Sequence, residues 1–150
     1  MTRHSGLLRL QASGLLVALL LSACEMVSTD TAIERIPVAV AAPSFSRDIA
    51  PVLAETCASS GACHFGPGAQ QGLELSVDSS YANLVNQLSA CCGLLVNPGD
   101  SANSFLVRVM DTSLAVRGGY PWRMPLTERP MPQPVVQTIK NWIAQGAPDN

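Results

Sequence analysis

The amino-acid sequence predicts an all-α domain of about four short helices joined by long loops. Apolar residues recur at helical spacing in four separate segments, and no segment shows a strong alternation of apolar and polar residues. The connections between the four segments are long and rich in Gly, Ser and Pro. Because loops longer than about 12–15 residues are uncommon in compact domains unless they serve a function, we expect an apolar group to fill the space between the helices.

The first two helices are predicted over residues 45–56 and 79–88. Pro51 falls inside the first segment, so that helix either starts late or kinks at this position. Asp78 or Ser79 would cap the second helix. The apolar stripes contain Phe45, Ile49, Val52 and Leu53 in the first segment, and Tyr81, Leu84, Val85 and Leu88 in the second.

The other two helices are predicted over residues 101–110 and 134–145. Asp100 would cap the third helix. In the fourth, Pro134 suits the first turn and Gly146 suits the end of the helix. Their apolar stripes contain Phe105, Leu106 and Val109 in the third segment, and Val135, Val136, Ile139, Trp142 and Ile143 in the fourth.

Residues 1–23 have the layout of a bacterial signal peptide. Basic residues precede an unbroken apolar run over 14–21, which is too short for a membrane-spanning helix of about 20 residues. The tetrad Leu-Ser-Ala-Cys that ends at Cys24 resembles the lipobox of bacterial lipoproteins, whose cysteine carries a diacylglyceryl group. The resemblance implies an exported protein that is lipid-anchored in the cell envelope. Because Glu25 rather than Asp follows Cys24, the resemblance favours an anchor in the outer membrane, with the protein facing the periplasm.

Removing residues 1–23 from the 150-residue chain leaves 127 residues, enough for one small domain. Two of the nine basic residues are lost and all eleven acidic residues remain, so the formal charge becomes −4. Without a basic stripe, a nucleic-acid partner is excluded. Residues 24–43 lack periodicity and end in Pro-Val-Ala-Val-Ala-Ala-Pro, which predicts a flexible, lipid-anchored linker ahead of a domain over 44–150.

Cysteine and histidine form the focal motif of the predicted domain. With Cys24 assigned to lipid, four cysteines remain, an even number in an oxidising compartment. A c-type haem requires two thiols and a histidine directly after the second, usually as C-x-x-C-H. Cys57, Cys63 and His64 fit this order, but five small residues separate the thiols. These residues could bulge from the loop without filling the space of a haem.

A second axial ligand of the iron would come from a distant loop. A thioether opposite histidine is the usual pairing in electron-transfer cytochromes. Met124 and Met131 both lie in the Pro-rich segment that precedes the last helix, and either could serve. Met110 fits the core side of its own helix instead.

Five segments of the sequence carry a family resemblance: Asp48-Ile49-Ala50-Pro51-Val52-Leu53, the Cys63-His64 pair, Pro98-Gly99-Asp100, Arg123-Met124-Pro125 and the terminal Trp142-Ile143-Ala144-Gln145-Gly146-Ala147. Through them, residues 45–150 resemble the cytochrome c-like domain of the planctomycete type, which is also common in exported myxobacterial lipoproteins. The resemblance implies that Cys57 and Cys63 attach haem c, that His64 is the proximal iron ligand, and that Met124 is the distal one, with Met131 as the alternative.

Cys91 and Cys92 are expected to be structural, because small exported domains favour disulfides. Adjacent cysteines rarely pair with each other, so we expect them to pair outward or one of them to stay buried. In one alternative, Cys63 alone forms a thioether and Cys57 pairs with Cys91 or Cys92.

The sequence thus predicts a single-electron carrier rather than an enzyme. The mature chain has one histidine and no nucleophile–base triad, and no C-x₂-C pair supports a zinc site. Its expected partners are redox proteins and, through Cys24, a lipid membrane. The alternative is a haem-free, disulfide-stapled lipoprotein that uses the same scaffold for binding or surface assembly.

Overall fold

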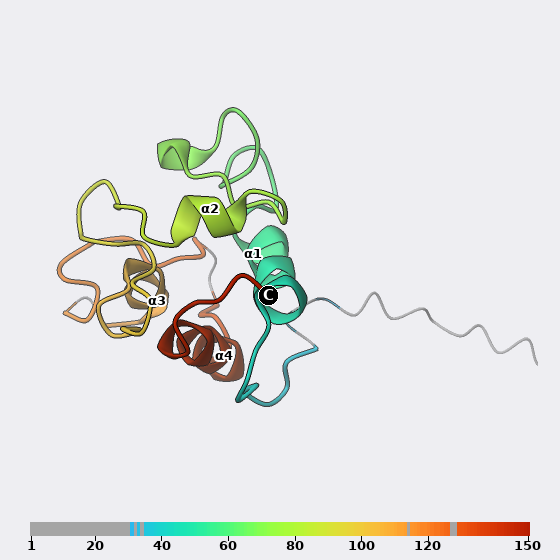
Figure 1. Cartoon of the computed structure of the whole chain (residues 1–150). Coiled ribbons are helices and arrows are strands. Elements are labelled where there is room, and N and C mark those ends of the chain that lie inside the picture. Colours follow the sequence, from blue (N-terminus) through green and yellow to red (C-terminus); the bar gives the residue numbers. More distant parts are fainter. Residues whose placement is uncertain (1–30, 32, 34, 114, 127–128) are drawn as a thin grey trace, which may run out of the picture.

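The computed structural model describes residues 31, 33, 35–113, 115–126 and 129–150. The predicted signal peptide and Cys24 lie outside these residues. The described part contains four α-helices and, in place of strands, two isolated β-bridges, which confirms the all-α class (Figure 1). No helix within it is long and apolar enough to cross a membrane. The helices are α1 (Ala50–Thr56), α2 (Ser80–Leu84), α3 (Phe105–Met110) and α4 (Gln133–Ala144).

Pro51 decides how the first helical segment begins. A π-helical turn over Phe45–Ile49 leads into α1, and the backbone N–H of Ala50 bonds the Phe45 carbonyl five residues back. Pro51 then occupies the first turn of α1, where its missing N–H leaves no gap in the helical ladder. The predicted segment is therefore helical throughout, with its irregularity just before the proline.

The second helix is shorter than predicted. Val85 is extended, and it forms a parallel bridge with Val96 instead of continuing α2. Asn86 has a positive φ of 59°, which turns the chain away from the helix axis. Leu88, expected on the apolar stripe, is consequently 77% exposed. A contact between residues distant in sequence thus overrides the helical periodicity.

The third helix starts at Phe105 rather than at residue 101. The Asp100 carboxylate accepts a bond from the Asn103 N–H, 3.1 Å away, and so closes a turn instead of capping the helix. Ser104 precedes α3, and its buried hydroxyl accepts a bond from the Asn97 N–H at 2.9 Å. Residues 101–104, which periodicity predicts as helical, therefore belong to the turn over 97–104.

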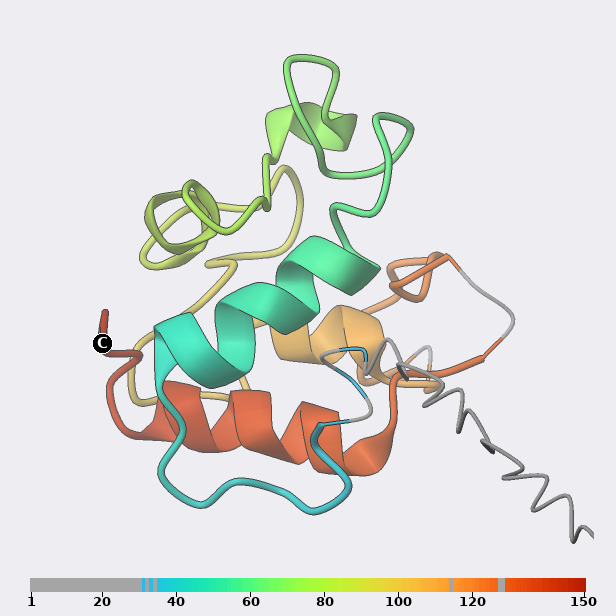
Figure 2. The ribbon, with the colours of Figure 1, turned by 90° about the vertical axis from the view of Figure 1, so that its right-hand side faces the viewer.

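The fourth helix, α4, packs one face into the core, and this face contains the apolar stripe that the sequence predicts. Figure 2 shows α1 running across α4, with α3 beside it. Phe45 lies 5.2 Å from the Trp142 ring and 5.1 Å from the Tyr81 ring, between ring centroids, so aromatic contacts join α4 to the first and second helical segments. The buried face of α4 contains Val135, Val136, Thr138, Ile139, Trp142 and Ile143.

Part of the predicted linker packs against α4. Ile36 is buried in the core. The Val40 N–H donates to the Thr138 hydroxyl at 2.9 Å, and the Asn141 amide donates to the Val40 carbonyl at 2.7 Å. Polar side chains of α4 thus satisfy backbone groups of this loop. Periodicity does not report such contacts, and residues 36–43 thus pack against the domain that the sequence predicts over 44–150.

Candidate functional site

A cavity of about 780 Å³ lies between α2, α3, the loop that carries Cys57 and Cys63 (the cysteine loop) and the Pro-rich segment that precedes α4. It lies within the range of about 300–1,000 Å³ that is typical of ligand and cofactor sites. Cys57, Cys63, His64 and Met124 all line it. The remaining lining residues are apolar, aromatic, hydroxyl or amide-bearing, with no Asp, Glu, Lys or Arg among them. The cavity therefore suits a large, mainly apolar group.

The cysteine loop begins where α1 ends. Cys57 is the C-cap residue of α1, and its N–H bonds the Leu53 carbonyl. The His64 N–H then bonds the Cys57 carbonyl at 3.0 Å, so the two ends of the loop meet. Residues 59–62 between them are exposed. The extra residues of the wide spacing thus bulge into solvent, while both thiols line the cavity.

Both loop thiols are free and half-buried. Burial raises the pKa of the Cys57 thiol; a contact with the Thr56 hydroxyl opposes the rise, and the neighbouring Cys63 adds to it. The Thr56 oxygen lies 3.5 Å from the Cys57 sulfur. Cys57 is therefore held as a neutral thiol at neutral pH.

The ring of His64 is oriented by a backbone carbonyl. Its Nδ1 lies 3.1 Å from the Leu73 oxygen. A carbonyl oxygen only accepts hydrogen bonds, so Nδ1 carries the proton and Nε2 keeps its lone pair. The Leu75 N–H bonds the His64 carbonyl at 2.8 Å, which fixes the backbone beside the ring. A carbonyl partner on the second ring nitrogen is typical of metal-ligating histidines.

The two candidate methionines have different surroundings. Met124 is half-buried and lines the cavity, and its N–H bonds the Val109 carbonyl of α3 at 2.7 Å. Met131 is 4% exposed, belongs to the hydrophobic core and does not line the cavity. The cavity therefore brings together His64 and Met124, from loops 60 residues apart in the sequence.

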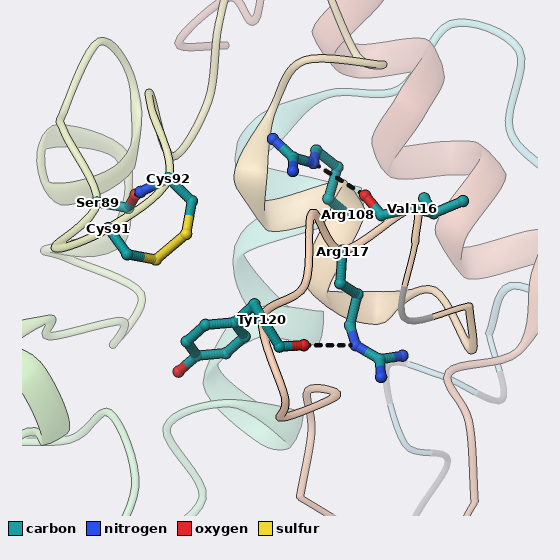
Figure 3. Close-up of a disulfide and its surroundings, with 7 residues drawn as sticks. All are labelled: Ser89, Cys91, Cys92, Arg108, Val116, Arg117 and Tyr120. Atoms are coloured by element: carbon teal, nitrogen blue, oxygen red, sulfur yellow. Dashed lines mark hydrogen bonds between the residues drawn. A yellow bond between two sulfur atoms is a disulfide. The ribbon is translucent and has the colours of Figure 1, made fainter.

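Cys91 and Cys92 form a disulfide with each other, contrary to the expected outward pairing. The two cysteines lie in a tight loop beside Ser89 (Figure 3). The Ser89 N–H bonds the Gly93 carbonyl, and the Cys92 N–H donates to the Ser89 hydroxyl, both at 2.8 Å. Gly93 supports this loop with a positive φ of 96°. Cys91 lines the cavity, so the disulfide borders the same space as the two free thiols.

Aromatic residues of the Pro-rich segment form a wall that the sequence analysis missed. Tyr120 and Trp122 line the cavity, and the Tyr120 ring packs edge-on against Phe105, with centroids 5.3 Å apart. The one signal in the sequence that could have identified Tyr120 and Trp122 was their position a few residues before Met124. Leu84 and Phe105 of the predicted apolar stripes line the cavity. Other stripe residues lie in the core without lining it, among them Ile49, Leu53, Trp142 and Ile143.

Comparisons with models of protein families, with curated proteins and with solved structures found no match to this chain. Within the described residues, no three His, Cys, Asp or Glu side chains are grouped so that they could hold a metal ion by themselves. A porphyrin brings its own four nitrogen ligands, so a haem site requires only axial ligands from the protein.

Proposed function

We propose that this protein is a c-type cytochrome, a membrane-tethered carrier of single electrons with covalently bound haem c. The observation that carries the proposal is one cavity lined by Cys57, Cys63, His64 and Met124. Its size and its uncharged lining suit a porphyrin. These four side chains are the two thiols and two axial ligands that a haem of this type requires.

Each residue then has a definite role. Cys57 and Cys63 would form the thioether bonds, and the Nε2 of His64 would be the proximal ligand of the iron. The thioether of Met124 would be the distal ligand, with Met131 the weaker choice because it is buried in the core. Bound haem supplies an iron that alternates between the ferric and ferrous states. The surrounding apolar and aromatic side chains exclude water and tune its potential.

The wide cysteine spacing is compatible with this arrangement. The hydrogen bond between the His64 N–H and the Cys57 carbonyl places Cys57 beside the histidine, as a short motif would. Cys57 is a free thiol, so it is available for a thioether bond. The Cys91–Cys92 pairing leaves neither of those cysteines to engage it.

Export and lipidation at Cys24 would place the domain in the cell envelope, at the outer membrane and facing the periplasm. The segment from Ile36 to Pro43 packs against the domain, so the lipid on Cys24 would tether the domain through the residues between them. The domain would therefore stay close to the membrane while it exchanges electrons with redox proteins. We assign it no catalytic reaction of its own.

The proposal is tested by expressing the full chain in the periplasm of a bacterium that carries a c-type haem maturation system. We expect one covalently bound haem per chain by mass spectrometry, haem staining on a denaturing gel, and the reduced spectrum of a c-type cytochrome. The C57S/C63S variant should lose all three signals, whereas the matched C91S/C92S variant should keep them. A wild-type chain of haem-free mass would overturn the proposal and favour a haem-free, disulfide-stapled binding lipoprotein.

A further inference from the structure

The segment that carries Met124 is a loop tied to α3 at its base. It leaves α3 at Asp111, the C-cap residue, and returns where the Met124 N–H bonds the Val109 carbonyl. Tyr120 adds a second attachment through its edge-on contact with Phe105 of α3. The position of Met124 in the cavity thus depends on how this loop is folded.

Arg117 fills the inside of this loop. Only 7% of the residue is exposed. Its Nη1 donates to the Asp111 carbonyl at 2.7 Å. Its Nε donates to the Tyr120 carbonyl at 3.1 Å (Figure 3). One guanidinium therefore joins the start of the loop to a residue four positions before Met124.

In the part of the chain that the structure describes, no carboxylate pairs with this buried cation. Among the described residues, ion pairs join Arg35 to Glu55 and Arg47 to Asp48, and neither involves Arg117. The guanidinium of Arg117 instead donates to the carbonyl oxygens of Asp111 and Tyr120. The Asp111 carbonyl lies at the C-terminal end of α3, where a cation is favourable. The guanidinium is thus placed to organise backbone rather than to neutralise an acid.

Among the described residues of the loop, the backbone hydrogen bonds are local and do not make this link. They run from Arg117 to Ser113, from Gly118 to Ala115 and from Tyr120 to Arg117. Arg108 supports the outside of the loop, since its Nε donates to the Val116 carbonyl at 3.0 Å (Figure 3). A Cβ at Gly118 would clash with the Arg108 guanidinium, so Gly118 permits this approach. Among the described residues, only the Arg117 side chain bonds both Asp111 and Tyr120.

We propose that Arg117 is the positioning residue for the distal haem ligand. By fixing Tyr120, it sets the short run through Pro121 that ends at Met124, and so holds the Met124 thioether in the cavity. This role rests on the proposed function, because it presumes an iron between His64 and Met124. A planar fork with several donors suits two carbonyls at fixed separation, whereas the single ammonium group of a lysine suits them less well.

The test compares R117Q and R117K with R47Q in the haem-loaded full chain. Arg47 is a matched control, because its side chain is 68% exposed, it pairs with Asp48 away from the loop, and R47Q makes the same charge change. In R117Q we expect loss of the ferric absorption band of the methionine–iron bond, a lower reduction potential, and carbon monoxide binding to the ferrous form at least ten times faster. R117K should lie between R117Q and wild type, and R47Q should match wild type.

A second measurement does not depend on haem. In the haem-free chain, R117Q should speed amide hydrogen exchange of Tyr120 and Met124 about tenfold, whereas R47Q should not. If R117Q does not load haem, R117K decides the outcome. A loaded R117Q that keeps the methionine–iron band overturns the positioning role, even if its potential falls through the lost charge. A wild-type chain without haem overturns the proposed function instead.

Discussion

The Nδ1 of His64 lies 3.1 Å from the carbonyl oxygen of Leu73, nine residues further along the chain. This contact fixes both the tautomer and the orientation of the ring, which leaves Nε2 as the basic nitrogen. Because His64 is the cavity-lining histidine of the described chain, it is the one group there that could give an iron a nitrogen ligand.

Replacing His64 is therefore expected to separate haem attachment from haem ligation. His64→Ala keeps Cys57 and Cys63, so some covalent haem should remain, but its iron lacks the proximal nitrogen. We expect a high-spin spectrum in both oxidation states and the loss of reversible one-electron chemistry. Absorption spectra and protein-film voltammetry measure both effects. Gln70→Ala is the control, since Gln70 also lines the cavity and has no ligand role. A low-spin spectrum in His64→Ala would contradict the assignment.

The two methionines should respond in opposite ways. Met124→Ala should leave the fold nearly intact but open the distal site, so that the ferrous form binds carbon monoxide and the reduction potential falls. Met131→Ala should keep the spectrum, yet lower the free energy of unfolding by about 2–5 kcal/mol, the usual cost of truncating a buried Met. Urea unfolding and carbon monoxide titration of both variants test this. If Met131→Ala opens the iron and Met124→Ala does not, the assignment is reversed.

The adjacent disulfide should contribute little to global stability. It joins neighbouring residues, so it closes no long loop in the unfolded chain. We expect the C91S/C92S variant to lose less than about 1 kcal/mol in free energy of unfolding, a figure that follows from this loop-closure argument. Chemical unfolding of the double variant and wild type provides the measurement, and a loss above about 3 kcal/mol, the scale of a disulfide that closes a long loop, would contradict it.

A single substitution at the disulfide should be more harmful than the double one. C91S leaves a free Cys92 thiol close to the cavity, where it can form a disulfide with Cys57 or Cys63. With oxidised glutathione as oxidant, two thiols become one disulfide and two glutathione molecules are released. We expect less covalent haem in C91S than in C91S/C92S, and a new disulfide by peptide mapping. Equal haem content in the two variants would contradict this expectation.

The sequence predicts features that depend on neighbouring residues and misses those set by distant ones. The predicted stripe of α4 is correct because it depends on local signals: the helical spacing of its apolar residues, Pro134 in its first turn and Gly146 just after its end. The end of α2 is missed because Val85 pairs with Val96. Likewise, the packing of Val40 depends on Thr138, which is 98 residues away.

The candidate site shows the same division. Residue types and order are enough to single out Cys57, Cys63 and His64, and the family resemblance favours Met124 over Met131 as the distal ligand. That Met124 lines the cavity depends on the bond between its N–H and the Val109 carbonyl, which no local pattern reveals. The pairing of Cys91 with Cys92 depends on the turn around Gly93, whereas general pairing habits predict an outward partner.

The thiol of Cys57 should titrate at higher pH in the folded, haem-free chain than in the unfolded chain. Burial raises the pKa of Cys57, and the thiolate is the form that reacts with alkylating agents. We expect iodoacetamide to modify Cys57 more slowly in the folded chain at neutral pH, with the rate rising at higher pH than in urea. Peptide mass spectrometry over a pH series measures the rate at Cys57. Equal midpoints in the folded and unfolded chains would contradict the shift.

The same shift makes the stability of the haem-free chain fall in alkali. A folded-state pKa above the unfolded value means that the folded chain holds the thiol proton more tightly. The resulting stabilisation is fully present below the unfolded pKa of about 8.5 and is lost as pH rises through the folded pKa. Urea unfolding from pH 7 to pH 10 should show this loss in wild type and less of it in Cys57→Ser, which has no thiol at this position. Parallel curves for the two proteins would mean that the Cys57 proton is not linked to folding.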